Sequence, residues 1–178
     1  MAALSPRPSR ATAFEWVPLA ELKTPQVRDG AAYWNHLRGD RPFPSRAEVT
    51  ARDLAPLLPY VSVVKIIDNG TDYEHRIIGD VMVRAFSMPL QNRRLSDIAK
   101  EAPDFAAYCW TPFRRVFESG QPVAWRSHTG NDNTWVVISD AEVVLLPLGN
   151  TADQVDRMLG FGTHFTRVAR TRPAFTPG

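Results

Sequence analysis

Four histidines and one cysteine are the side chains best suited to binding a metal or a haem: His36, His75, His128, His164 and Cys109. No two histidines lie four residues apart, and none has a second ligand type at metal-binding spacing. His75, in a predicted strand, is the best candidate ligand, although a polar strand residue bonded to the backbone explains it as well. A single cysteine also excludes an internal disulfide. The sequence therefore predicts no metal site and no cofactor.

A second chemical possibility is the string Arg157-Met-Leu-Gly160-Phe-Gly162. It is similar to the loop with which one acetyltransferase fold binds a pyrophosphate at a helix N-terminus. That chemistry needs a helix directly after the loop, but only 16 residues follow Gly162, and they show no helical pattern. A small acyl-CoA-dependent acetyltransferase is therefore the alternative function. The preferred interpretation is that the glycines relieve crowding in a last strand.

Other catalytic arrangements are not indicated. Asp68, Asp72 and Glu74 lie close together, but they flank an Asn-Gly turn, where carboxylates are normally solvated. Neither a nucleophile elbow nor a Gly-rich oxyanion loop is present. We therefore predict a protein that is not an enzyme and has no catalytic residues.

Composition places the chain among one-domain globular proteins, with 178 residues of which 44% are hydrophobic and 22% charged. No apolar run approaches the roughly 20 residues of a membrane helix. The net charge is +2, and the 21 basic residues are scattered rather than clustered. We expect a cytoplasmic protein that binds neither membranes nor nucleic acid.

Helix signals come first along the chain. Thr24 and Pro25 suit the N-cap and first position of a helix, apolar residues recur at helical spacing to Leu37, and Gly39 ends it. A β-hairpin follows over 61–67 and 73–78, joined by Asp68-Asn69-Gly70. Because the first hairpin strand is apolar on both faces, both faces must be covered. One cover is expected from later helices and the other from Trp34 and Leu37.

Several short helical pieces then precede one long helix over 103–119, which Pro103 begins and Gly120 ends. Three strands are predicted after it, within 122–128, 135–148 and 155–165. Strands at both ends of a helical insert indicate an α+β fold with an antiparallel sheet. We expect a single domain over residues 16–166, a disordered lead over 1–13 and a disordered tail over 167–178.

This order of elements resembles the PAS sensory fold, and particularly a subfamily of small stand-alone bacterial PAS-like proteins. The resemblance covers about three-quarters of the chain. It is carried by six segments: Tyr33-Trp34-x-x-Leu37-Arg38-Gly39, Pro44-Ser45-Arg46, Leu57-Leu58-Pro59, His75-Arg76-Ile77-Ile78-Gly79, Glu142-Val-Val-Leu-Leu-Pro147-Leu148 and Val155-Asp-Arg-Met-Leu159-Gly160. The fold implied is a five-stranded antiparallel sheet, with short helices and one long helix on one face and the N-terminal helix on the other.

The resemblance implies a sensor or adaptor in bacterial signalling. Such a protein holds a small ligand between sheet and helices, or binds a protein partner, and signals through dimerisation or docking. A homodimer or a signalling-protein partner is therefore expected. The ligand-binding residues would be the apolar and polar-tipped side chains on the inner face of the sheet and the facing helices, although the same residues could simply fill the core: His75, Met82, Phe86, Phe105, Cys109, Phe113 and Trp125.

Charged residues within apolar runs need partners, because burying an unpaired charge is costly. Glu142 precedes an apolar strand and Arg76 lies within one. We expect Glu142 to bond either Arg46 or Arg76 and so join the hairpin to the later strands. The alternative is a solvent-facing Glu142.

Overall fold

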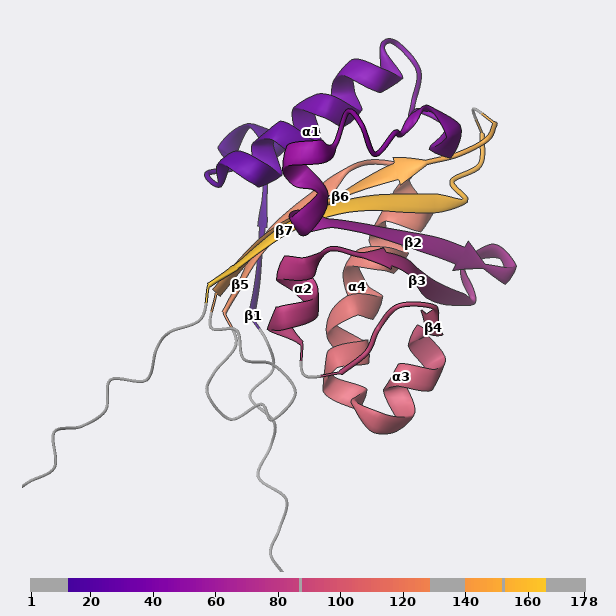
Figure 1. Ribbon diagram of the computed structural model, residues 1–178. Helices are drawn as coiled ribbons and strands as arrows, with labels where there is room; N and C mark the ends of the chain where they lie inside the picture. Colours follow the sequence, from indigo (N-terminus) through magenta and orange to yellow (C-terminus); the bar gives the residue numbers. More distant parts are fainter. Residues whose placement is uncertain (1–12, 87, 129–139, 152, 166–178) are drawn as a thin grey trace, which may run out of the picture.

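One antiparallel sheet runs through the part of the chain that the computed structural model describes, residues 13–86, 88–128, 140–151 and 153–165. Helices pack on both of its faces (Figure 1). The α+β class and the antiparallel pairing are therefore confirmed. The expected count of five strands is wrong, because the sheet has seven, in the order β1-β5-β6-β7-β2-β3-β4.

Two short edge strands account for the difference. β1 (Ala13–Val17) pairs with β5, and the two-residue β4 (Arg93–Arg94) pairs with β3. The expected strands are present as β2 (Val61–Ile67), β3 (Asp72–Ile78), β5 (Val123–His128), β6 (Asp140–Leu148) and β7 (Arg157–Phe165). β1 begins at the last residue of the predicted lead. The rest of that lead, 1–12, and the tail from 166 lie outside the described residues.

The hairpin of β2 and β3 forms as its turn residues predict. Asp68, Asn69 and Gly70 have φ angles of 43°, 56° and 84°, which Asn, Asp and Gly tolerate best. A register shift between Val63 and Val64 marks a bulge in the pairing. The hairpin joins the later strands through β2 and β7, so the sheet is continuous.

The outer face of the sheet, which we define as the face covered by α1 (Pro25–Arg38), carries its own apolar cluster. Trp34 is buried there, and its indole N–H donates a hydrogen bond to the carbonyl of Pro147 at 2.8 Å. Gly30 allows close contact, because a Cβ at that position would overlap the ring of Phe161. Short 3-10 helices complete the chain around this layer: Leu19–Glu21, Arg46–Glu48 and Ala55–Tyr60, with a fourth at the hairpin turn, Asp68–Gly70.

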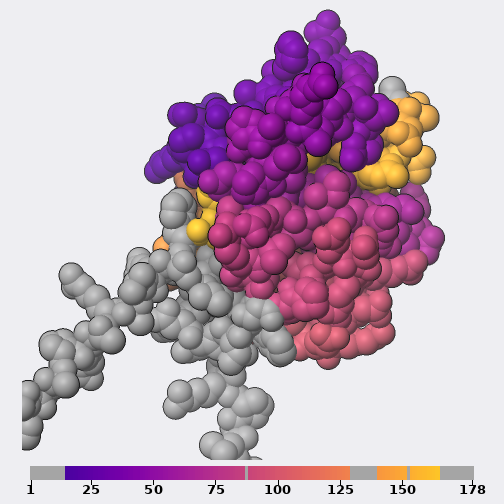
Figure 2. Space-filling model, in the orientation of Figure 1, coloured from indigo at the N-terminus to yellow at the C-terminus, as the bar shows by residue number. Residues whose placement is uncertain are grey.

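The inner face, the opposite one, is covered by α2 (Asp80–Ala85), α3 (Leu95–Glu101) and α4 (Pro103–Ser119). Pro103 begins α4 and Gly120, with a φ of 62°, ends it, as predicted. Figure 2 shows the two helical layers as a nearly closed surface, with the orange and yellow strands visible only at the margins between them.

Glu142 has a different partner from the one expected. It is 4% exposed, yet Arg46 and Arg76 bond Val49 and Glu74 instead. The Nε–H of Arg126, its cross-strand neighbour on β5, donates to the Glu142 carboxylate at 3.0 Å. The expected hairpin contact is therefore wrong.

The same carboxylate also caps the start of α1. The amide N–H of Lys23 donates to both of its oxygens at 3.1 Å, and the amide of Thr24 donates at 2.7 Å. A carboxylate is favoured at the positive end of a helix dipole. Glu142 therefore attaches α1 to the outer face of the sheet, a role that depends on strand register.

Replacing Glu142 with Gln should lower the free energy of unfolding by about 1–3 kcal/mol at neutral pH. One of the two acceptor oxygens becomes an NH2 group, so the buried donors that bonded it lose their acceptor. Burial opposes ionisation of Glu142, but hydrogen bonds from Thr24, Lys23 and Arg126 outweigh it and lower the carboxyl pKa. The stabilisation is then present above the unfolded pKa, about 4.3, and is lost as the pH falls through the lower folded pKa. Urea denaturation across pH 3 to 7 measures the difference.

The matched control is Glu118→Gln. Glu118 pairs with Arg114 on an exposed turn of α4, so its loss should cost at most about 0.5 kcal/mol. A difference between wild type and Glu142→Gln that stays constant down to pH 3 would contradict the ionised pairing.

Candidate functional site

The candidate site is the apolar layer between the inner face of the sheet and the helices α2 and α4. Six of the seven predicted ligand residues belong to the apolar cluster of this layer or pack against it. Met82 is partly buried and packs against the cluster, and the other five are buried members: Phe86, Phe105, Cys109, Phe113 and Trp125. His75 is 2% exposed and lies against the ring of Phe113, with centroids 5.6 Å apart. The structure thus places all seven residues in the layer that the sequence indicated.

One end of this layer is formed by His75 and its aromatic neighbours. The ring of Tyr73 packs edge-on against Phe113 and Trp110, at centroid distances of 5.4 and 5.5 Å. Burial lowers the pKa of His75 to about 4, and a hydrogen bond to the backbone of Arg93 only partly offsets this. Two buried polar atoms here have no hydrogen-bond partner within the described structure, the hydroxyl of Tyr73 and Nδ1 of His75.

The other end of the layer is formed by His164, which sequence reasoning did not assign to the site. Its ring packs edge-on against Phe86 at 5.6 Å, and Phe86 packs against Phe105 at 4.7 Å. Both ring nitrogens are buried, and neither has a hydrogen-bond partner among the described residues. Burial lowers the pKa of His164 to about 4, so the ring is neutral at physiological pH.

The two histidines are far apart along the sheet. Val64 of β2 pairs with both His75 and Met158, and His164 lies six residues beyond Met158 on β7. At about 3.3 Å per residue, this separates the two ends by about 20 Å. One small ligand would therefore contact one end or the other, and His75 and His164 do not form a joint site.

The glycines of β7 shape the His164 end. Gly160 is tightly packed, because a Cβ there would overlap the hydroxyl of Ser62. A Cβ on Gly162 would instead meet only ordinary contacts, the nearest being Nε2 of His164 and a methyl of Val143, each at 3.4 Å. A side chain as small as that of Ala would therefore fit at Gly162, in ordinary contact with its neighbours.

Between the two ends, a hydrogen-bonded pair of aromatic residues links α4 to β5. The indole N–H of Trp125 donates to the hydroxyl of Tyr108 at 2.9 Å, and that hydroxyl is 2.9 Å from Oγ of Ser127. Burial raises the pKa of Tyr108 to about 12, so the hydroxyl keeps its proton. These polar atoms are satisfied within the protein, unlike those of Tyr73 and His164.

Cys109 lies on the same stripe of α4 as Phe105 and Phe113, and it is 7% exposed. Burial raises the pKa of its thiol far above the usual value, so the thiolate does not form at neutral pH. Its surroundings suit packing, not nucleophilic attack.

The alternative acetyltransferase loop is contradicted by the structure. Residues Arg157 to Gly162 lie in β7, which pairs with β6 on one side and β2 on the other. Their backbone N–H groups are therefore part of a strand ladder and do not form a phosphate-binding turn. Gly160 relieves crowding against Ser62, as the strand interpretation predicted.

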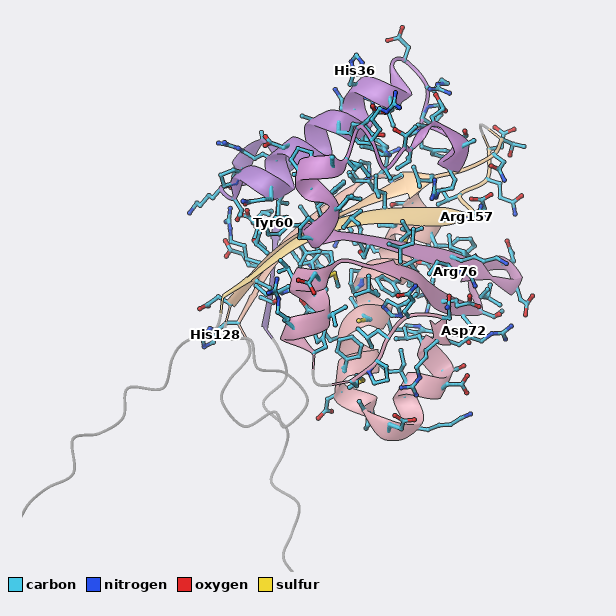
Figure 3. The ribbon with its side chains drawn as sticks, in the orientation of Figure 1. His36, Tyr60, Asp72, Arg76, His128 and Arg157 are labelled. Atoms are coloured by element: carbon cyan, nitrogen blue, oxygen red, sulfur yellow. The ribbon has the colours of Figure 1, made fainter. Side chains whose placement is uncertain are left out.

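A groove of about 670 Å³ lies outside this layer, beside the start of α1. Among its polar walls, Arg126 forms an ion pair with Glu142 and His128 hydrogen-bonds Asp140, and Lys23 also lines it. His128 marks this end of the sheet, opposite Arg76 and Arg157 (Figure 3). The groove is therefore a polar margin of the α1 attachment and shares none of the predicted ligand residues.

A family model described as PAS domain matches residues 22–163. The chain belongs to the PAS domain family. Comparison with curated proteins found no match, and comparison with solved structures found none. The recognition made from sequence is confirmed, and β1 lies before the matched region of the PAS domain.

The described part of this PAS domain contains no helix long and apolar enough for a membrane crossing. Within the same residues, His, Cys, Asp and Glu side chains form no group of three that could hold a metal ion.

Two phenylalanine substitutions test the hydrogen-bond assignments of this layer. Tyr73→Phe removes a buried hydroxyl without a partner, so the free energy of unfolding should stay constant or rise, by up to about 2 kcal/mol. Tyr108→Phe removes the hydroxyl that bonds Trp125 and Ser127, and it should lower the free energy of unfolding by about 1–3 kcal/mol. Denaturant unfolding of both variants measures the contrast, and equal losses would contradict it.

Proposed function

We propose that this PAS domain is a non-enzymatic sensor that holds a small, largely apolar ligand between the inner face of its sheet and helices α2 and α4. It acts in the bacterial cytoplasm and signals through dimerisation or docking to a protein partner. PAS domains have a sensory role in general, and family membership supports that part of the proposal.

The observation that carries the proposal is a set of buried polar atoms that have no hydrogen-bond partner among the described residues, in a mostly apolar layer. They are the Tyr73 hydroxyl, His75 Nδ1 and both ring nitrogens of His164. Leaving such a group unbonded costs about 1–3 kcal/mol. A ligand that bonds one of them recovers this cost on binding, which favours a binding layer over a purely structural core.

Strand β7 provides the route from the ligand layer to the outer face. Its residues alternate, so His164 faces the inner layer while Phe161 and Thr163 face α1. Phe161 packs against Gly30, and the Thr163 hydroxyl is 3.3 Å from that of Thr24, at the start of α1. A ligand that shifts β7 therefore changes the packing of α1, which carries the signal to a partner.

A thermal-shift screen of metabolites tests the proposal. A ligand at 100 times its dissociation constant should stabilise the domain by about 2.7 kcal/mol, without turnover. Cys109→Trp fills the centre of the ligand layer and should abolish the shift. Ala107→Trp, on the exposed side of the same helix, should retain it.

If Cys109→Trp fails to fold, Cys109→Leu replaces it, because leucine fills less space than tryptophan. Cys109→Leu should weaken ligand binding. A shift of equal size in wild type and a folded Cys109 variant would place the ligand elsewhere. A screen in which nothing stabilises the wild type would reject the ligand-sensing role, and turnover of a ligand would reject the non-enzymatic one. Native mass spectrometry of protein purified from its own host adds the bound molecule and the oligomeric state.

A further inference from the structure

His164 is the polar group of the ligand layer that is best placed to form hydrogen bonds with a ligand. The ring of His164 lies on the inner face of β7 against Phe86, and neither of its nitrogens has a partner among the described residues. His75 differs, because its ring bonds the backbone of Arg93 and packs against Phe113. Of the two buried imidazoles, His164 therefore keeps the greater free hydrogen-bonding capacity, with two unpartnered nitrogens against one among the described residues.

We infer that the ligand presents an uncharged group that both donates and accepts hydrogen bonds, such as a hydroxyl or a primary amide, to His164. This inference rests on the proposed function and specifies the ligand's chemical class. A neutral imidazole carries one N–H donor and one nitrogen acceptor, which such a group complements. Burial keeps the His164 pKa at about 4, in agreement with a neutral ring.

The described surroundings of His164 offer no charged partner to a ligand. Its ring contacts Phe86, and no charged side chain among the described residues contributes to the shift of its pKa. The two buried carboxylates lie elsewhere: Asp72 accepts hydrogen bonds from Ser96 at the start of α3, and Glu142 faces α1. Asp140 is near in register, but it shares the outer face with Glu142 and pairs with His128. A charged ligand would therefore lose its hydration without gaining an ion pair.

The same geometry favours a flat apolar body. Phe86 stands edge-on to both His164 and Phe105, and Gly162 carries no side chain beside the imidazole. Aromatic rings prefer edge-to-face or offset contacts, so an aromatic ring suits a place in contact with Phe86. A small aromatic alcohol or amide combines this body with the required polar group.

Three probes of similar shape separate these features: phenol, benzene and benzoate. We expect phenol to bind wild type about three- to tenfold more tightly than benzene, the worth of one net hydrogen bond, and benzoate to bind most weakly. His164→Phe should abolish the preference of phenol over benzene, and His164→Gln, which keeps a donor and an acceptor, should retain part of it. Affinities come from NMR titration of the backbone amides.

His75→Phe is the matched control, because it removes the other buried imidazole and should leave the phenol preference unchanged. Gly162→Ala adds a methyl group in ordinary contact with Nε2 of His164 and should weaken the binding of phenol and benzene alike. The ¹⁵N shifts of the His164 ring should change with phenol and not with benzene.

A phenol preference that survives in folded His164→Phe, or that disappears in folded His75→Phe, overturns the inference. Failure of all three probes to bind wild type also overturns it. These results leave the proposed sensing function standing whenever the metabolite screen finds a ligand, since only a negative screen rejects that function.

Discussion

The central strands of this sheet are buried on both faces, and the rest of the structure depends on that constraint. Every residue of β6 from Ala141 to Leu148 is buried. Such a sheet is stable only when apolar layers cover both sides. The α1 segment covers one side, and α2, α3 and α4 cover the other. The first helix and the helical insert are therefore both required, because each covers one of the two faces of the same strands.

Buried polar groups in the two layers differ in whether the described residues provide them with hydrogen-bond partners. On the outer face, Glu142 accepts hydrogen bonds from Arg126, Lys23 and Thr24, so its burial is compensated. On the inner face, His164 has no such partner among the described residues. The first arrangement fixes an element in place, whereas the second leaves binding capacity unused within the described protein. That contrast is why we assign the proposed sensing role to the inner face.

Local signals in the sequence were sufficient for most of the architecture. Pro25 and Gly39 bound the first helix, Asn69 and Gly70 suit the hairpin turn, and the apolar stripe of the long helix indicates its buried side. The core positions of the predicted ligand residues followed from the same patterns. Each of these signals is read within a few residues of chain, which is why they could be recognised without knowing the tertiary fold.

Features that depend on strand register could not be recognised this way. Glu142 meets Arg126 because β5 and β6 pair in one register, across the segment 129–139 that separates them in sequence. His164 faces Phe86 because β7 alternates from Met158 onward, and a shift of one residue would turn it toward α1. β1 is recognisable only weakly, since five residues give a short alternating pattern. In each case the decisive partner is remote in sequence.

The imidazole of His164 lies on β7, a strand that contacts both helical layers. This strand is bonded to β6 and β2, contacts α2 on one face and packs against α1 on the other. A ligand held by His164 therefore acts on a strand whose next residue, Thr163, already contacts the start of α1. No long chain of intermediate contacts is needed, because the two faces of one strand are separated by a single residue. In the proposed sensor, the sheet is thus both the wall of the ligand layer and the element that transmits its occupancy.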